Sequence, residues 1–91
     1  MTYRFFSDPG HGWLEVPKKE LAELGIAEKI SAYSYQSRQM AYLEEDCDLA
    51  VFLRAKGFPV GQVAKFWPQV VEIEANQDSP VRNMPSYQVP A

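Results

Sequence analysis

Residues 42–48 read Tyr-Leu-Glu-Glu-Asp-Cys-Asp, and this stretch decides the fold because two kinds of element meet in it. Residues 40–44 place alternate side chains on opposite faces, which predicts a strand. Residues 47–56 have one broad apolar side, which predicts a helix. The acids between them suit a first helical turn, where unbonded N–H groups and the helix dipole attract negative charge. We therefore expect Asp46 or Asp48 to cap the helix.

A hairpin and a short helix are predicted upstream. Residues 2–6 alternate weakly and are rich in aromatic residues, which predicts a strand, and residues 13–16 predict a second strand that pairs with it. The connection, Ser-Asp-Pro-Gly-His-Gly at residues 7–12, is typical of a turn because proline fixes one φ and glycine permits positive φ. Pro17 then suits the first position of a helix, and Gly25 suits its end.

A second hairpin is predicted from residues 30–35 and 40–44, with residues 36–39 as its loop. Gly57 is expected to end the helix that follows. In residues 59–67 the apolar side chains recur at i, i+3, i+4 and i+7, which favours a helix begun by the proline at its start. A glycine and β-branched valines in the same segment argue against a helix.

The last third of the chain predicts a strand and a tail. Residues 70–75 alternate in polarity and indicate a strand, and an extended proline-rich tail follows from about residue 79. Arg82 and Tyr87 are placed to fold back. Together the elements predict a single α+β domain over residues 1–91, in which a small antiparallel sheet of hairpins carries two or three short helices packed on one face.

Composition limits the classes of function. The 91 residues include nine Lys and Arg against twelve Asp and Glu, for a mildly acidic net charge of −3. Because the basic residues are scattered, direct nucleic-acid binding is disfavoured. The single cysteine excludes an internal disulfide and fits a reducing cytoplasm. No apolar run approaches the roughly 20 residues of a membrane span. We expect a cytoplasmic monomer or homodimer with no cofactor.

The acidic segment allows three interpretations. In the first, one acid caps the helix and the others are solvated. In the second, several carboxylates supply oxygen ligands to a hard cation, although the spacing of an EF-hand loop is missing. In the third, the acids form a contact patch for a basic protein partner. The candidate binding residues are Glu44, Glu45, Asp46, Asp48, Phe66, Trp67 and Arg82.

His11, between two glycines, is the chain's only histidine and a candidate general acid or base. The alternative is a turn histidine that bonds local backbone or lies in solvent. A zinc site would need His11 with Cys47 and carboxylates, without the usual paired spacing, so no metal site is predicted. Acidic neighbours disfavour a Cys47 thiolate, and a buried, inert cysteine is the commoner outcome. The candidate catalytic residues are His11, Glu45, Asp46 and Cys47.

Phe66 and Trp67 are the expected exposed anchor for a partner, because two adjacent large aromatic residues cannot both face inward on a strand. Most of the other aromatic residues are expected in the core. Basic residues do not interleave with them as single-strand nucleic-acid binders require. Arg82 is expected to pair with the acidic cluster.

The segments Gly-His-Gly-Trp-Leu at residues 10–14 and Tyr-Leu-Glu-Glu-Asp-Cys-Asp at residues 42–48 carry a resemblance. The chain resembles small uncharacterised proteins of bacteria and of their phages or plasmids that have similar segments. The resemblance extends over residues 7–52 and includes residues 79–87, and it implies an accessory or host-interaction role. It assigns no residue a function.

The sequence thus supports three hypotheses. The first is a small intracellular interaction or modulator protein, of phage or plasmid type, that binds a host protein through an acidic and aromatic surface. The second is a small hydrolase or metal-dependent enzyme that uses His11 with the Glu44–Asp48 cluster. The third is an acidic mimic of nucleic acid. The distance from His11 to the cluster discriminates between the first two.

Overall fold

The first hairpin forms as the turn residues predict. In the computed structural model, which describes residues 2–59 and 61–90, β1 (Tyr3–Ser7) pairs antiparallel with β2 (Gly12–Pro17). β2 also pairs antiparallel with β4 (Met40–Glu44), whose bounds are those of the predicted strand. Trp13 lies opposite Glu44 in this register. The loop before β2 therefore lies beside the acids that follow β4.

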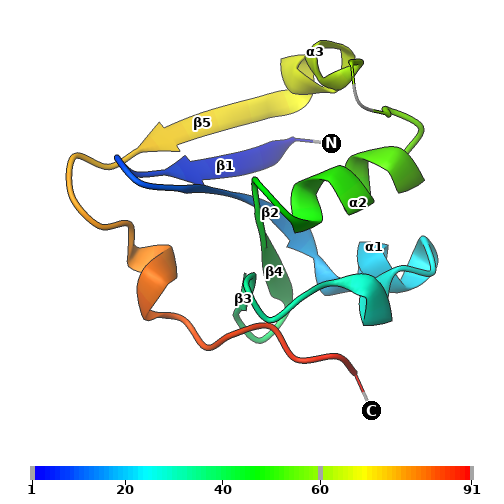
Figure 1. The fold of residues 1–91 in the computed structure, drawn as a ribbon, viewed down its shortest axis with the longest axis horizontal. Helices are drawn as coiled ribbons and strands as arrows, with labels where there is room; N and C mark the ends of the chain where they lie inside the picture. Colours follow the sequence, from blue (N-terminus) through cyan, green and yellow to red (C-terminus); the bar gives the residue numbers. More distant parts are fainter. Residues whose placement is uncertain (1, 60, 91) are drawn as a thin grey trace.

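The strands form one mixed sheet in the order β3-β4-β2-β1-β5 (Figure 1). The α+β fold is confirmed, but the expectation of an entirely antiparallel sheet is wrong, because β5 (Val70–Glu74) pairs parallel with β1. Parallel strands need a long crossover connection rather than a tight turn. The chain provides one here, since it reaches β5 through the helices that follow β4.

The strand predicted over residues 30–35 is mostly absent. Only β3 (Tyr35–Gln36) pairs with β4, and a short 3-10 helix, η1 (Ala27–Lys29), precedes it. The backbone N–H of Ser31 donates to the Asp48 carboxylate instead of to a neighbouring strand. A hydrogen bond from backbone to a side chain competes with strand pairing, which explains why the strand is shortened.

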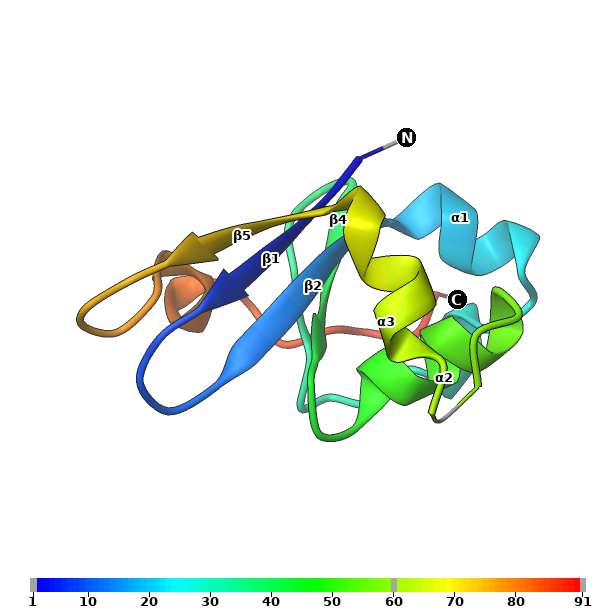
Figure 2. The same cartoon turned by 90° about the horizontal axis from the view of Figure 1, so that it is seen from above.

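Three short helices pack on one face of the sheet (Figure 2). They are α1 (Lys18–Glu23), α2 (Asp48–Ala55) and α3 (Val63–Phe66). Gly25 and Gly57 follow the first two with φ of 72° and 95°, as predicted for residues that end helices. Among the described residues, no helix has the length and apolar character needed to cross a membrane.

The helix predicted from Pro59 begins later and is shorter. α3 has four residues and starts at Val63, after Gly61 has taken a φ of 94°. Such a backbone conformation cannot continue a right-handed helix. Val60, part of the predicted pattern, lies outside the described residues. A 3-10 turn, η2 (Trp67–Gln69), connects α3 to β5.

The opposite face of the sheet is covered by the end of the chain (Figures 1 and 2). The predicted extended tail begins instead with a 3-10 helix, η3 (Pro80–Asn83). Val81 packs there with Trp13 and Tyr42 in a second, smaller core. Tyr87 folds back as expected: it is buried, and its hydroxyl donates to the Ala27 carbonyl over 2.6 Å.

Candidate functional site

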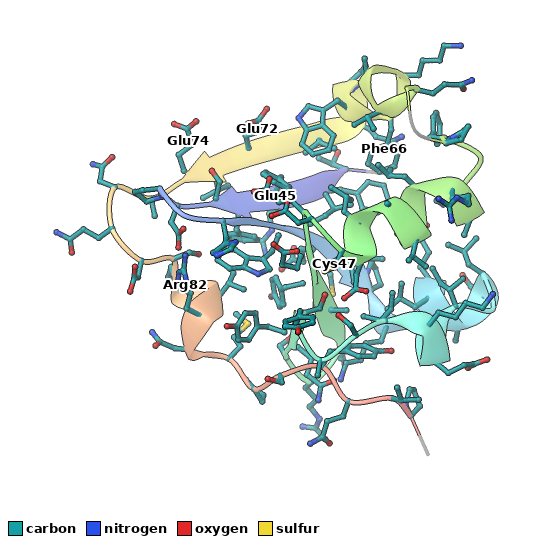
Figure 3. The ribbon with its side chains drawn as sticks, in the orientation of Figure 1. Glu45, Cys47, Phe66, Glu72, Glu74 and Arg82 are labelled. Atoms are coloured by element: carbon teal, nitrogen blue, oxygen red, sulfur yellow. The ribbon has the colours of Figure 1, made fainter. Side chains whose placement is uncertain are left out.

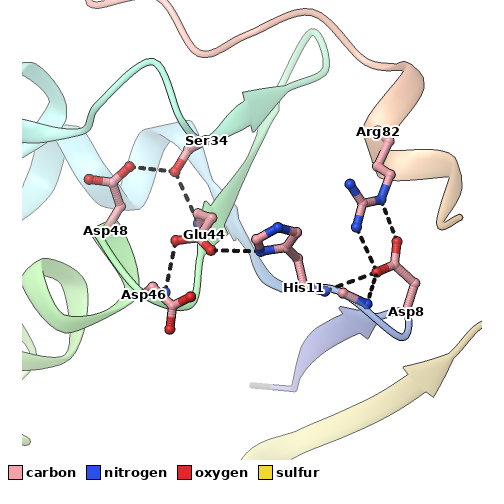
Figure 4. Close-up of polar contacts among 8 residues, drawn as sticks. Asp8, His11, Ser34, Glu44, Asp46, Asp48 and Arg82 are labelled. Carbon is pink, nitrogen blue, oxygen red and sulfur yellow. Dashed lines mark hydrogen bonds and ion pairs between the residues drawn. The ribbon is translucent and has the colours of Figure 1, made fainter.

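His11 reaches the acidic segment. Its Nδ1 lies 3.4 Å from Oε1 of Glu44 (Figure 4). Strand register accounts for this contact, because Trp13 lies opposite Glu44 and the Glu45 N–H donates to the Gly12 carbonyl over 3.0 Å. Strand pairing therefore places the Gly-His-Gly loop beside the end of β4, and the two segments that the sequence analysis singled out form one site.

Asp8 organises the loop that carries His11. Its Oδ1 accepts the N–H groups of Gly10 and His11, each over 3.0 Å. Neither glycine has a positive φ, so the expected reason for glycine is wrong here. A Cβ on Gly10 would lie 2.9 Å from Nη2 of Arg82, and one on Gly12 would overlap the Phe5 ring. The glycines are needed for close approach, not for backbone freedom.

The Asp8 carboxylate also holds the C-terminal segment. Arg82 donates to it through two nitrogens, over 2.6 and 2.9 Å, and the Ser79 N–H donates over 2.9 Å. The guanidinium, followed by the backbone donors, holds the pKa of Asp8 far below its usual range. Arg82 therefore pairs with Asp8 and not with the acidic cluster, which corrects the prediction. Its Cζ also lies 5.3 Å from the centroid of the Trp13 ring.

Glu44 is buried and has a fixed orientation. Its Oε2 accepts the Asp46 N–H over 2.8 Å, which leaves Oε1 facing His11. Its own N–H donates to Oγ of Ser34 over 3.0 Å. Hydrogen bonds at both ends of the residue hold this carboxylate toward the loop.

Asp48 has a structural role different from the predicted one. It is 3% exposed and accepts hydrogen bonds from the Ser31 N–H and from the hydroxyls of Ser31 and Ser34. Cys47 occupies the N-cap position of α2, which has no side-chain cap, so neither Asp46 nor Asp48 caps the helix. The buried carboxylate instead fixes the turn that precedes β3, because it satisfies polar groups that would otherwise be buried without partners.

Cys47 and Glu45, two of the other catalytic candidates, are labelled in Figure 3. Cys47 is exposed, contrary to the expectation of a buried cysteine. Desolvation and then the Glu44 and Asp48 carboxylates raise the pKa of its thiol, which disfavours the nucleophilic thiolate. Desolvation and then Asp46 raise the pKa of Glu45. Glu45 does not line the pocket around His11; its side chain lies beside Gly12 and lines a separate hollow with Leu49 and Leu53.

A pocket of about 330 Å³ surrounds the contact between His11 and Glu44. We call it the acidic–aromatic pocket. Its lining residues are His11, Trp13, Tyr33, Tyr35, Glu44, Asp46, Cys47 and Arg82. Most of the aromatic residues were expected in the core, and Trp13 is indeed buried there at the pocket wall. Tyr33, in contrast, is 75% exposed, in the turn between Ser31 and β3.

Searches of protein-family models, curated proteins and solved structures found no match to this chain. The function therefore has to be inferred from the site, and the resemblance to phage and plasmid proteins stays a prediction.

The prediction that Phe66 and Trp67 form an exposed anchor is wrong for Phe66, and Trp67 is only partly exposed. Phe66 is fully buried, because α3 turns its ring into the core against Tyr3 and Phe52. Trp67 is half-buried and packs on Phe5 with ring centroids 5.1 Å apart. Its indole N–H donates to Glu72 over 2.9 Å. A helix lets adjacent aromatic residues point in different directions, which the assumption of a strand did not consider.

The pocket also contains a set of metal-ligating groups. One atom each from His11, Glu44 and Asp46 can be chosen so that all lie within 4.8 Å of one another. A ring nitrogen with two carboxylates is a donor set that zinc and other divalent ions accept. Of these groups, only Asp46 and His11 are exposed.

The different roles of Asp46 and Asp48 can be tested by alanine substitution. Asp48→Ala would leave the Ser31 and Ser34 donors without their acceptor, and we expect it to lower the free energy of unfolding by about 3 kcal/mol. Asp46→Ala removes an exposed carboxylate and should change it by less than about 0.5 kcal/mol. Urea unfolding measures both, and equal losses would contradict the assignment.

The depressed pKa of Asp8 predicts a pH dependence. In the unfolded chain this carboxyl takes up a proton near its ordinary pKa of 3.8, whereas in the folded protein it does so only at lower pH. The stability that wild type has over Asp8→Asn should therefore be constant above about pH 5 and shrink as the pH falls below about 4. Urea unfolding across pH tests this, with the exposed Asp78→Asn as control. A difference that persists unchanged to pH 2 would exclude the proposed role.

Proposed function

We propose that the protein is a small interaction protein that binds a partner protein through the face carrying the acidic–aromatic pocket. The observation that supports this most is the pocket itself, which combines exposed aromatic surface with two carboxylates at its wall. Interfaces are enriched in tyrosine and tryptophan at their centres, with polar groups that fix orientation. A volume of about 330 Å³ is in the range that binds a side chain or a small ligand.

Tyr33 is the proposed anchor. It is 75% exposed, although the turn that carries it is held by Asp48 on both sides, through Ser31 and Ser34. A rigid backbone beneath an exposed aromatic ring lowers the entropic cost of binding. Tyr33 also lines the acidic–aromatic pocket, so its ring and the pocket form one continuous surface for a partner.

The biological setting in this proposal is that of an accessory protein. It would act in the cytoplasm as a modulator of a host protein, the role that the resemblance to phage and plasmid proteins implies. The acidic net charge of −3 would favour association with a basic partner surface.

Affinity capture with matched variants tests the proposal. Wild type immobilised on resin should recover a specific protein from a bacterial lysate, and Tyr33→Ala should weaken binding of the purified partner by about tenfold or more. Val63→Ala, which removes exposed apolar surface on α3 at the other face, is the control and should bind like wild type. If both variants bind as tightly as wild type, the pocket face is not the binding site.

The dependence of the complex's affinity on salt concentration distinguishes an interaction protein from an acidic mimic of nucleic acid. An interaction protein of this kind should lose affinity moderately with salt, since few charges line the pocket. A partner that is a nucleic-acid enzyme, bound with an affinity that falls steeply with salt, would instead favour the acidic mimic.

A second candidate is a hydrolase or metal-dependent enzyme, which the 3.4 Å approach of His11 to Glu44 favours. Glu44 would orient the imidazole, and His11 would act as general base or as a metal ligand with Asp46. This candidate predicts that Zn²⁺ or Mn²⁺ binds by calorimetry and that His11→Gln abolishes the binding. It also predicts His11-dependent hydrolysis of an activated ester. Heat signals equal in wild type and His11→Gln would reject the metal site.

A further inference from the structure

We infer that the acidic–aromatic pocket takes the guanidinium group of an arginine side chain on the partner protein. This inference rests on the proposed function, because it names the group that the partner inserts. Three properties of the pocket support it: its charge balance, the orientation of its carboxylates and the nature of its walls.

The charge balance favours a cation. Glu44 and Asp46 each bring a negative charge to the lining, and Arg82 brings the one permanent positive charge among the lining residues. That charge is already neutralised, because Arg82 is bonded through two nitrogens to the Asp8 carboxylate, whose side chain has no exposed surface. Two carboxylates thus face at most one further positive charge, that of His11 when it is protonated.

The carboxylates are arranged to receive a ligand. The Asp46 N–H holds Oε2 of Glu44, so Oε1 stays directed at the pocket beside His11. Asp46 itself is exposed. A guanidinium carries five N–H donors in a planar fork, which suits neighbouring carboxylate oxygens better than the single ammonium of lysine does.

The aromatic walls also suit a planar cation. Trp13 and Tyr35 meet edge to face, with centroids 6.0 Å apart, and Tyr33 extends the aromatic surface into solvent. Arg82 already lies over the Trp13 ring, so the chain itself shows a guanidinium accommodated in this environment. The ring faces of Tyr33 and Tyr35 are the further aromatic surface in the pocket lining.

Titration with capped amino acids tests the inference by NMR. Acetyl-arginine-amide should shift the Trp13 indole signal and the Tyr33 and Tyr35 ring signals. The indole of Trp67, the only other tryptophan, lies on the far side of the sheet and should not move. Acetyl-citrulline-amide has the same shape without the charge. It should bind about tenfold more weakly or not at all, because the charge-assisted hydrogen bonds are lost.

Variants assign the binding to the two carboxylates. Asp46→Asn and Glu44→Gln should each weaken acetyl-arginine-amide binding about threefold to tenfold, because each removes a charge and keeps the shape. Asp46→Asn changes an exposed side chain, so its loss of binding cannot be attributed to unfolding. Glu74→Gln removes a charge from β5, outside the pocket, and should leave binding unchanged.

The outcomes separate this inference from the proposed function. Equal binding of the arginine and citrulline probes, or binding of neither, overturns the inference. If the captured partner still depends on Tyr33 in that case, the proposed function stands without it. Arginine-selective binding in a protein that captures no partner would support the pocket chemistry and overturn the interaction role.

Discussion

The Asp8–Arg82 pair is the contact on which the rest of the site depends. It joins residues 74 positions apart in the sequence and holds the C-terminal segment against the loop that carries His11. The same carboxylate accepts hydrogen bonds from the N–H groups of Gly10, His11 and Ser79. One side chain therefore fixes the conformation of the loop and the position of η3, and it holds Arg82 over the Trp13 ring. A buried carboxylate is stable only when its acceptor capacity is used, and Asp8 meets that condition.

Asp8 and Asp48 both have buried carboxylates, and each is stabilised by a different set of hydrogen-bond donors. Asp8 is balanced by a guanidinium and by backbone donors, whereas Asp48 is surrounded by the N–H and hydroxyl groups of Ser31 and Ser34. The first fixes one wall of the acidic–aromatic pocket and the second fixes the turn that carries Tyr33. Between them, Glu44 is left as the carboxylate directed at His11. Asp8 and Asp48 therefore position the backbone on either side of the carboxylate that faces His11.

Local signals in the sequence predicted most of the fold. The turn residues predicted the first hairpin, and Gly25 and Gly57 predicted where two helices end. Both predictions succeed because a tight turn and a helix end depend only on residues that are neighbours in the sequence. Two of the wrong predictions share a cause: residues 30–35 and the tail after residue 79 are shaped by contacts with Asp48 and Asp8, which are distant in the sequence. Phe66 was misplaced because the exposed anchor was inferred as if residues 66 and 67 lay on a strand, although the apolar spacing of residues 59–67 favoured the helix that forms there. For the candidate site, the sequence identified His11 and the acids. The aromatic walls escaped it because the exposure of Tyr33 is a tertiary property.

Nuclear Overhauser effects between the rings of His11 and Trp13 measure most directly whether the Asp8–Arg82 pair assembles the site. The ring centroids lie 6.1 Å apart, so cross-peaks are expected in the wild-type protein. They should weaken or vanish in Arg82→Gln, which removes the charged fork, and persist in Asp78→Asn, whose side chain is exposed. Cross-peaks that are absent in wild type, or as strong in Arg82→Gln as in wild type, would contradict the dependence of the site on this pair.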